Sequence, residues 1–242
     1  MKVIRTSLIP AFFLLICIVN TAFFYVADNS PLTGAWKLQH GNDEHVAVFI
    51  DGYCTITGFS KKDKKFTFTR GGTYVAEKDK LSLQYEFDTK QKDQVGTTTS
   101  FSFVVYNNQL TSDISGKSEV WTRIDDGTKN LAGLWKITGR KQADTIAQIH
   151  QTGPRKTVKI LSGTRFQWAA INPETKEFFG TGGGNYTIVN AKYTENIEFF
   201  SRDSSRVGAS LSFNGKLENG AWHHSGSSSK GEPIYEVWSK VK

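Results

Sequence analysis

Cysteine is nearly absent from this 242-residue sequence, which contains only Cys17 and Cys54. Cys17 lies in an N-terminal apolar run that we expect to act as an export segment, which leaves Cys54 alone in the mature chain. An intramolecular disulfide is then excluded, and the fold has to rest on its hydrophobic core. Cys54 lies in the strand-like stretch DGYCTITGF, so we interpret it as a small buried hydrophobic residue rather than a nucleophile.

Proline, methionine and helix-forming patterns are also scarce. The chain has one Met and five Pro, and no stretch has the spacing of a long amphipathic helix. Aromatic residues make up 13% of it and glycine occurs 22 times, a combination typical of β-strands joined by tight turns. After residue 27 no apolar run is long enough to span a bilayer, so we expect that part of the chain to be soluble.

The N-terminus, in contrast, is strongly apolar. Lys2 and Arg5 precede an apolar run over residues 8–27, a pattern that predicts an export signal. Cleavage after Ala22 or Ala27 would release the mature chain, whereas an uncut run of about 20 residues would anchor it in a membrane. We therefore expect residues 1–27 to be a signal peptide or an anchor. The protein would be exported: periplasmic, secreted or membrane-anchored at its N-terminus.

Positive charge exceeds negative charge only slightly. The formal net charge is +7, or +5 without Lys2 and Arg5, and the positive residues are scattered apart from KKDKK at residues 61–65. That cluster lies between two strand-like stretches and is typical of a solvated hairpin tip. We therefore predict no nucleic-acid partner, and membrane contact only through an uncleaved N-terminal segment.

The two halves of the sequence repeat each other. PLTGAWKLQHG at 31–41 matches NLAGLWKITGR at 130–140, with Trp36 opposite Trp135. Further matches follow in the same order: GGTY with GGNY, QYEF with NIEF, VGTTTSFSF with VGASLSF, and EVWTRI with EVWSKV. Ordered matches of this kind indicate a tandem duplication. The units cover residues 32–124 and 131–242, and DDGTKN at 125–130 is the turn between them.

Within each unit the hydrophobic pattern has a period of two rather than 3.6. Stretches such as EHVAVFI, KFTFTR and KLSLQYEF have the composition of strands, and turn signals such as YNN at 106–108 and FNG at 213–215 separate them. About eight short strands per unit suit a small closed barrel, which leaves no exposed sheet edge. The predicted fold is all-β: two tandem small antiparallel β-barrels after the N-terminal export segment.

Each unit opens with Gly-x-Trp and ends with a basic residue shortly after its last Trp. This arrangement resembles the lipocalin superfamily, in which that Trp closes one end of the barrel and stacks under a late Arg. The resemblance implies two structural cation–π pairs, Trp36 with Arg123 and Trp135 with Lys240. The units are shorter than typical lipocalins and lack their usual disulfide, so their own side chains could fill the barrels.

Two longer stretches, LSGTRFQWAAINPETKEFFGTGGG and YTENIEFFSRD, carry a second resemblance. They are similar to exported bacterial proteins with lipocalin-like domains, a group commonly labelled only as membrane or secreted proteins. The likeness covers nearly the whole chain. It implies the tandem fold and export, and it implies no particular activity.

The second unit is richer in polar and aromatic side chains than the first, which favours it as the functional one. In TRFQWAA, alternation places Arg165 and Gln167 on one face and Trp168 on the other. In YTENIEFFSR it separates two sets: Tyr193, Glu195, Ile197 and Phe199, and Asn196, Glu198, Phe200 and Arg202. Inside a barrel such groups would orient a ligand, whereas on the surface they would face water or pair with each other. The predicted ligand-binding residues are Arg165, Trp168, Glu198, Arg202 and His223.

No motif predicts a cofactor, a bound metal or a catalytic residue. His223 and His224 are adjacent, so on a strand they point to opposite faces and would rarely bind one metal together. The serines that follow them lack a marked Asp–His partnership. GTGGGNY at 180–186 lacks the helix that makes glycine loops bind phosphate, and we interpret it as a bulge or tight turn.

Three functions are consistent with these patterns. We favour non-enzymatic binding of a small, partly apolar ligand, chiefly in the second barrel. The alternative is a cell-envelope module with filled barrels that binds a protein or glycan through an exposed aromatic face. The third is a small-barrel isomerase or hydrolase with Glu198 or His223 as its base.

Overall fold

The structure is a computed structural model that describes residues 30–128, 131–142, 145–149, 153–228 and 230–241. The predicted export segment lies outside the described residues, so export and localisation stay predictions. The described residues are mostly β-strand, with two 3-10 helices, η1 (Lys92–Gln94) and η2 (Ser204–Arg206). Within these ranges, no helix is long and apolar enough to cross a membrane.

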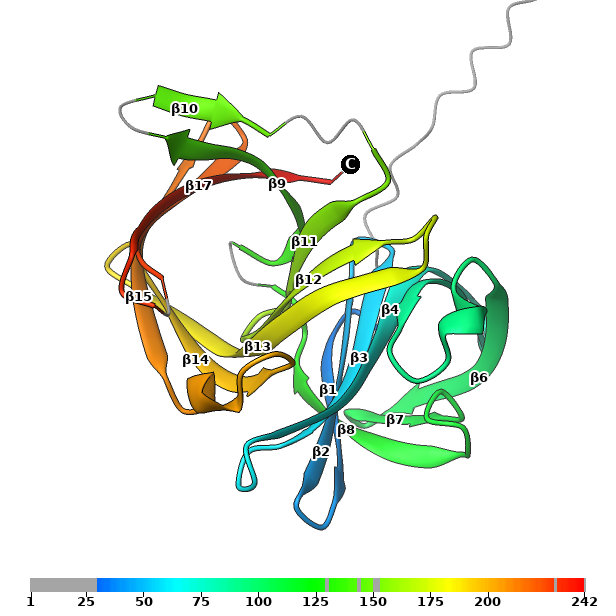
Figure 1. The fold of residues 1–242 in the computed structure, drawn as a ribbon. Coiled ribbons are helices and arrows are strands. Elements are labelled where there is room, and N and C mark those ends of the chain that lie inside the picture. Colours follow the sequence, from blue (N-terminus) through cyan, green and yellow to red (C-terminus); the bar gives the residue numbers. More distant parts are fainter. Residues whose placement is uncertain (1–29, 129–130, 143–144, 150–152, 229, 242) are drawn as a thin grey trace, which may run out of the picture.

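The first barrel is a closed antiparallel ring in which each strand pairs with the next and β1 also pairs with β8 (Figure 1). Closure gives every strand two hydrogen-bonded neighbours and removes the free edges. Its strands are β1 Gly34–His40, β2 Asp43–Ile50, β3 Tyr53–Ser60, β4 Lys65–Glu77, β5 Lys80–Asp88, β6 Thr98–Tyr106, β7 Gln109–Ser112 and β8 Glu119–Asp125.

The second barrel closes through β9 and β17. Its strands are β9 Gly133–Gln142, β10 Thr145–Gln148, β11 Lys156–Leu161, β12 Arg165–Asn172, β13 Glu177–Val189, β14 Lys192–Phe200, β15 Ser210–Glu218, β16 Ala221–Ser227 and β17 Pro233–Lys240. Because β10 and β11 pair with successive parts of β9, together they take the position of β2 in the first barrel. The predicted all-β fold of two tandem eight-stranded barrels is therefore confirmed.

Local turn signals predict one hairpin correctly and another wrongly. Asn107 and Asn108 join β6 to β7 with φ of 47° and 58°, the conformation of a two-residue type I′ turn. FNG at 213–215, in contrast, lies inside β15, and the turn comes later, at Asn219 and Gly220. Pairing of β15 with both β14 and β16 outweighs the local preference of Asn214 and Gly215 for a turn.

The interior of the first barrel is filled by its own side chains. A cluster that includes Trp36, Phe49, Leu83 and Trp121 occupies it, and each of these four side chains is fully buried. Cys54 belongs to the same cluster, where burial raises the pKa of its thiol far above the ordinary value and Arg70 only partly opposes the shift. This environment agrees with a packing role for Cys54 and not with nucleophilic reactivity.

The two barrels pack side by side through apolar outer faces. Val48 and Phe59 of the first barrel belong to one buried cluster with Ile160 and Phe199 of the second, and the Phe59 and Phe199 ring centroids are 4.9 Å apart. Buried polar contacts also cross this interface, because the Gln167 side-chain amide bonds to hydroxyl groups of both barrels. Figure 1 shows the two barrels side by side, with β12 and β13 of the second next to β3 and β4 of the first.

Candidate functional site

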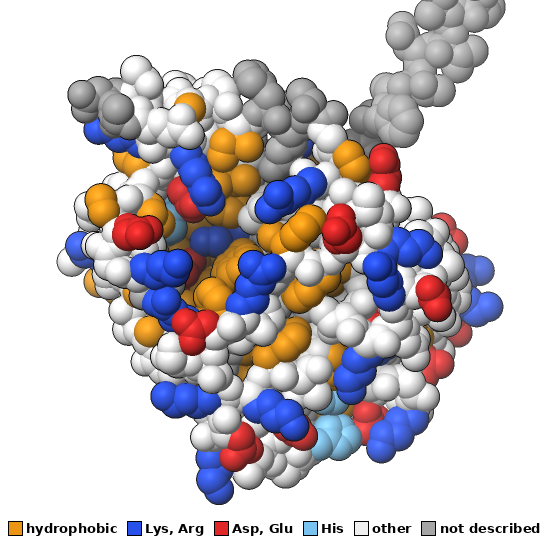
Figure 2. Space-filling view, in the orientation of Figure 1, with side chains coloured by type: hydrophobic (Ala, Val, Ile, Leu, Met, Phe, Trp, Pro, Cys, Tyr) orange, Lys and Arg blue, Asp and Glu red, His pale blue; other side chains and the backbone are white. Residues whose placement is uncertain are grey.

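A cavity of about 350 Å³ opens into the second barrel. Figure 2 shows this hollow, with hydrophobic side chains around it and basic side chains both at its depth and at its rim. The lining side chains come from every strand of the barrel wall except β10 and β13. They are Arg140, Thr157, Lys159, Trp168, Ala170, Glu195, Ile197, Phe200, Leu211, Phe213, His224, Ser228, Ile234, Glu236 and Trp238.

Aromatic rings form much of the cavity wall. Trp168 on β12 and Phe200 on β14 meet edge to face, with centroids 5.5 Å apart. Gly182 on β13 pairs with Trp168, and a Cβ atom at Gly182 would approach both the Trp168 and Phe200 side chains to 2.8 Å. The glycine therefore lets these two rings lie against the backbone of β13, so that they narrow the cavity less than they would over a larger residue.

Charged side chains lie deeper, among the rings. Lys159 Nζ is 2.8 Å from Glu195 Oε1, and the Tyr193 hydroxyl donates to the same oxygen at 2.9 Å. The side chains of Lys159 and Glu195 are only 5% and 7% exposed, so water screens this pair weakly. The Lys159 ammonium also lies 5.1–5.8 Å from the centroids of four rings: Phe166, Tyr193, Trp222 and Trp238. Its positive charge is thus held by one carboxylate and an aromatic cage.

His224 is the buried polar residue of the cavity whose contacts are incomplete. It is 2% exposed, and both ring nitrogens lack a hydrogen-bond partner among the described residues. Its Nδ1 lies 3.7 Å from Glu236 Oε2, which is longer than a direct hydrogen bond. Burial lowers the pKa of His224, Lys159 lowers it further, and Glu236 opposes the shift. The imidazole is therefore neutral at pH 7, with one donor and one acceptor to offer.

Glu236 connects His224 to the mouth of the cavity. Its carboxylate lies 3.1 Å from the exposed Arg140 guanidinium and accepts a hydrogen bond from Trp238 Nε1 at 3.2 Å. Burial alone would raise the pKa of Glu236, but His224 and the charges of Lys159 and Arg140 outweigh burial and lower the pKa to about 2. We call Lys159, Glu195, His224 and Glu236 the polar ring.

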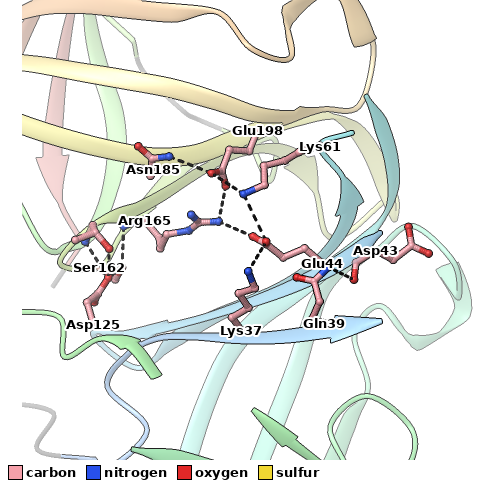
Figure 3. Close-up of polar contacts among 11 residues, drawn as sticks. Lys37, Gln39, Asp43, Glu44, Lys61, Asp125, Ser162, Arg165, Asn185 and Glu198 are labelled. Atoms are coloured by element: carbon pink, nitrogen blue, oxygen red, sulfur yellow. Dashed lines mark hydrogen bonds and ion pairs between the residues drawn. The ribbon is translucent and has the colours of Figure 1, made fainter. Parts of the chain in front are cut away.

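Two of the predicted ligand residues, Arg165 and Glu198, lie outside the cavity. Their side chains point away from the barrel interior and meet between the barrels, where Arg165 Nη2 is 2.5 Å from Glu198 Oε2 and 3.3 Å from Glu44 Oε1 (Figure 3). Lys37 and Lys61 complete this network by pairing with Glu44, and Lys61 also pairs with Glu198. These contacts join the barrels and leave Arg165 and Glu198 at least 90% buried.

The position of Phe199 departs from simple alternation along β14. A β-bulge between Gly183 and Gly184 of β13 shifts the register, so that Gly183 pairs with Phe199 and Gly184 with Ile197. Glu198 and Phe199 then both contribute to the inter-barrel contact, whereas Phe200 lines the cavity. The prediction that Phe199 shares a face with Glu195 is wrong because the bulge adds one residue to this side of the ladder.

The other three predicted residues are spread over the barrel. Trp168 lines the cavity, as described above. Arg202 is exposed and lies against Gly180, and a Cβ atom at Gly180 would come within 3.3 Å of the Arg202 side chain. His223 faces away from the barrel interior, and its Nδ1 is 2.9 Å from the Tyr235 hydroxyl. Direct ligand contacts by these residues stay predictions.

The residues named for barrel closure differ between the barrels. The Arg123 guanidinium lies 4.0 Å from the Trp36 ring centroid, and it donates hydrogen bonds to the carbonyls of Thr33 and Pro31. Lys240 pairs with Trp135 in the ladder, but its Nζ lies 3.7 Å from Asp51 of the first barrel. Arg123 thus contacts its own barrel and Lys240 bridges the two.

Sequence reasoning missed Lys159, His224 and Glu236 as lining residues. A position-by-position comparison of the two units offers a signal for two of them, because Lys159 occupies the position of Ala47, and His224 that of Ser112. Across the described residues, no group of three His, Cys, Asp or Glu side chains lies close enough together to hold a metal ion. No protein-family model matches the chain, and no curated protein matches it in sequence.

Proposed function

We propose that the protein binds a small, partly apolar ligand in the cavity of its second barrel. The observation that carries this proposal is a cavity of about 350 Å³ with an aromatic wall and a buried His224 whose nitrogens lack hydrogen-bond partners among the described residues. Ligand cavities in proteins have volumes of about 300–1,000 Å³ and combine an apolar lining with few polar groups. This cavity is at the small end of that range, so it suits a ligand of modest size.

The unpartnered histidine supports a ligand more strongly than the cavity alone. A buried polar group without a hydrogen bond destabilises a protein by roughly 1–3 kcal/mol. A ligand hydroxyl or amide within reach of His224 would supply the missing bond, and the rings of Trp168, Phe200 and Phe213 would contact its apolar part. Binding would therefore remove the free-energy cost of the unmade hydrogen bonds of His224.

The alternatives receive less support from the side-chain positions. An interaction module with filled barrels fits the first barrel, but the second has a cavity. For an isomerase or hydrolase, Glu198 and His223 are poorly placed as bases because both side chains lie outside that cavity. Ligand binding uses the residues that do line it.

Native mass spectrometry on protein purified from its own host provides the first test. We expect an adduct of one small molecule per chain that is released on denaturation, and its mass would define the ligand. For protein that loses its ligand during purification, titration with the uncharged fluorophore N-phenyl-1-naphthylamine tests the empty cavity. We expect a saturable rise in fluorescence with one site per chain.

A pair of arginine substitutions localises the binding. Gly182→Arg places a long side chain at the cavity wall, at the position that Arg70 occupies in the first barrel. Val189→Arg adds the same charge to an exposed position of the same strand and serves as the control. We expect Gly182→Arg to abolish fluorophore binding and Val189→Arg to preserve it. Equal binding by both folded variants, or none by the wild type, would refute the proposal.

A further inference from the structure

The charges inside the second barrel are already paired, and this restricts the ligand that it can accept. Among the described lining residues the cations are Lys159 and Arg140, and the carboxylates are Glu195 and Glu236. Lys159 pairs with Glu195 at 2.8 Å, and Arg140 pairs with Glu236 at 3.1 Å. The remaining titratable side chain of the lining, His224, is buried with its pKa lowered, so it adds no charge at neutral pH.

Among the described lining residues, an anionic ligand would find no unpaired cation at this depth. The Lys159 ammonium is 5% exposed and already occupied by Glu195, and both carboxylates of the polar ring would repel a third. Arg140 is 58% exposed at the rim, where solvent screens its attraction. A ligand carboxylate placed beside His224 would therefore lose its hydration without gaining a partner of opposite charge.

A cationic ligand meets the opposite obstacle. The most favourable site for an ammonium group in this barrel is the aromatic cage beside Glu195, and the side chain of Lys159 fills it. The Tyr193 hydroxyl donates to the same Glu195 oxygen that accepts from Lys159, so this oxygen is shared by two donors already. An incoming cation would have to displace a tethered one.

We infer that the ligand of the second barrel is electrically neutral, with an aromatic or similarly apolar body and a hydroxyl- or amide-type end that hydrogen-bonds to His224. The inference rests on the proposed function, because it names the ligand class for the same cavity. An uncharged group that both donates and accepts matches a neutral imidazole, which has one nitrogen of each kind. The aromatic wall of Trp168, Phe200 and Phe213 matches a flat apolar body.

Three compounds with one naphthalene body test the charge preference. They are the neutral alcohol 2-(1-naphthyl)ethanol, the carboxylate 1-naphthaleneacetate (called the acetate below) and the cation 2-(1-naphthyl)ethylammonium (called the amine below). Their affinities for the wild-type protein are measured by calorimetry at pH 7. We expect the alcohol to bind at least about tenfold more tightly than either ion, because an unpaired buried charge is strongly disfavoured.

Variants of the buried pair should redirect this preference. Glu195→Gln leaves the Lys159 ammonium unpaired, so the acetate should gain about tenfold or more relative to the alcohol. Lys159→Met leaves the Glu195 carboxylate in an empty aromatic cage, so the amine should gain instead. The double variant Lys159→Met/Glu195→Gln restores neutrality and with it the preference for the alcohol. Should Lys159→Met fail to fold, Glu195→Gln and the double variant decide the question.

The outcomes separate this inference from the proposed function. If the acetate or the amine binds the wild type most tightly, the inference of a neutral ligand is overturned while ligand binding stands. If the preference does not follow the charge left in the cavity, the polar ring does not select the ligand, and the inference fails in the same way. If neither the fluorophore nor any naphthyl compound binds, the proposed function itself fails.

Discussion

The two barrels share one strand plan and differ in what fills them. Ala47 in the first barrel lies opposite Trp36, as Lys159 in the second lies opposite Trp135. Leu83 pairs with Tyr74, as Glu195 pairs with Tyr186. At both positions the first barrel has a fully buried apolar side chain, and the second has a member of a buried ion pair. Duplication thus kept the ladder while the interiors diverged.

A third pair of corresponding positions, Arg70 and Gly182, shows the same divergence. In the first barrel, Arg70 donates a hydrogen bond to the carbonyl of Ile114, whose side chain is fully buried in the barrel core. In the second barrel, Gly182 takes the place of Arg70. Gly182 pairs with Trp168 of the neighbouring strand, and Arg70 pairs with Ile56, which corresponds to Trp168. An arginine bonded to the core of the first barrel therefore corresponds to a glycine beside the cavity of the second.

The largest expected effect comes from giving the second barrel the apolar residues of the first. Lys159→Ala alone leaves the buried Glu195 carboxylate without its cation and should lower the free energy of unfolding by about 3–5 kcal/mol. Lys159→Ala/Glu195→Leu removes both charges and should recover most of that loss. Urea denaturation of the three proteins measures both effects. A double variant no more stable than the single one would show that the pair is not coupled.

Acid should destabilise the second barrel through His224 and Glu236. Because the folded pKa of His224 is below 6.5, the unfolded chain binds its proton first, and stability falls as the pH drops through 6.5. The Glu236 pKa of about 2, against 4.5 when unfolded, adds stability above pH 4.5 that is lost between pH 4.5 and 2, on the order of 3 kcal/mol.

A matched histidine in the first barrel provides the control for this acid effect. Burial, reinforced by His40, also lowers the pKa of His45, but that residue is less buried than His224. We therefore expect His224→Phe to flatten the stability profile between pH 7 and 5 more than His45→Phe. Denaturation midpoints of both variants across this pH range provide the test. A larger flattening in His45→Phe than in His224→Phe would mean that the first barrel, and not the second, causes the pH dependence of stability.

Arg70 of the first barrel can be replaced by the glycine found at the corresponding position of the second. Arg70→Gly deletes this side chain and its hydrogen bond to Ile114, and should lower stability by about 1–3 kcal/mol. The uncharged fluorophore should still bind at one site per chain, because apolar side chains fill the interior of the first barrel. Binding at a second site in the folded variant would mean that Arg70, rather than this apolar core, keeps the fluorophore out of the first barrel.

The smallest effects are expected where sequence reasoning placed ligand residues outside the cavity. Arg202→Ala and His223→Ala change side chains on the outer side of the second barrel, so each should alter stability by about 0.5 kcal/mol or less. Fluorophore affinity should stay unchanged, whereas Trp168→Ala should change it measurably. Loss of binding in Arg202→Ala would place the site elsewhere on the barrel.

Sequence patterns predicted the architecture because the repeat and the period-two alternation can be read from the order of residues alone. The Trp36 and Trp135 match defined two units, and alternation in TRFQWAA correctly separated Arg165 from Trp168. Alternation does not show which of the two faces is interior, because neither face of this strand is exposed to bulk water. One face lines the interior of the second barrel, and the other packs against the first barrel. The sequence predicts Arg165 and Glu198 as ligand-binding residues for this reason, and the structure places both outside the cavity. Buried charged residues beside aromatic rings occur both in the barrel interior and at the contact between the barrels.

The strand pattern, the duplication and the unusual polar residues of the second unit follow from the order of amino acids alone. Which of those residues share an enclosed space depends on how the strands assemble. Lys159, Glu195, His224 and Glu236 come from four different strands and meet only when the barrel closes. A single bulge beside Gly183 places Phe199 at the barrel interface with Glu198 and turns Phe200 into the cavity. Side-chain direction depends on the register of neighbouring strands, and that register is a property of the assembled sheet.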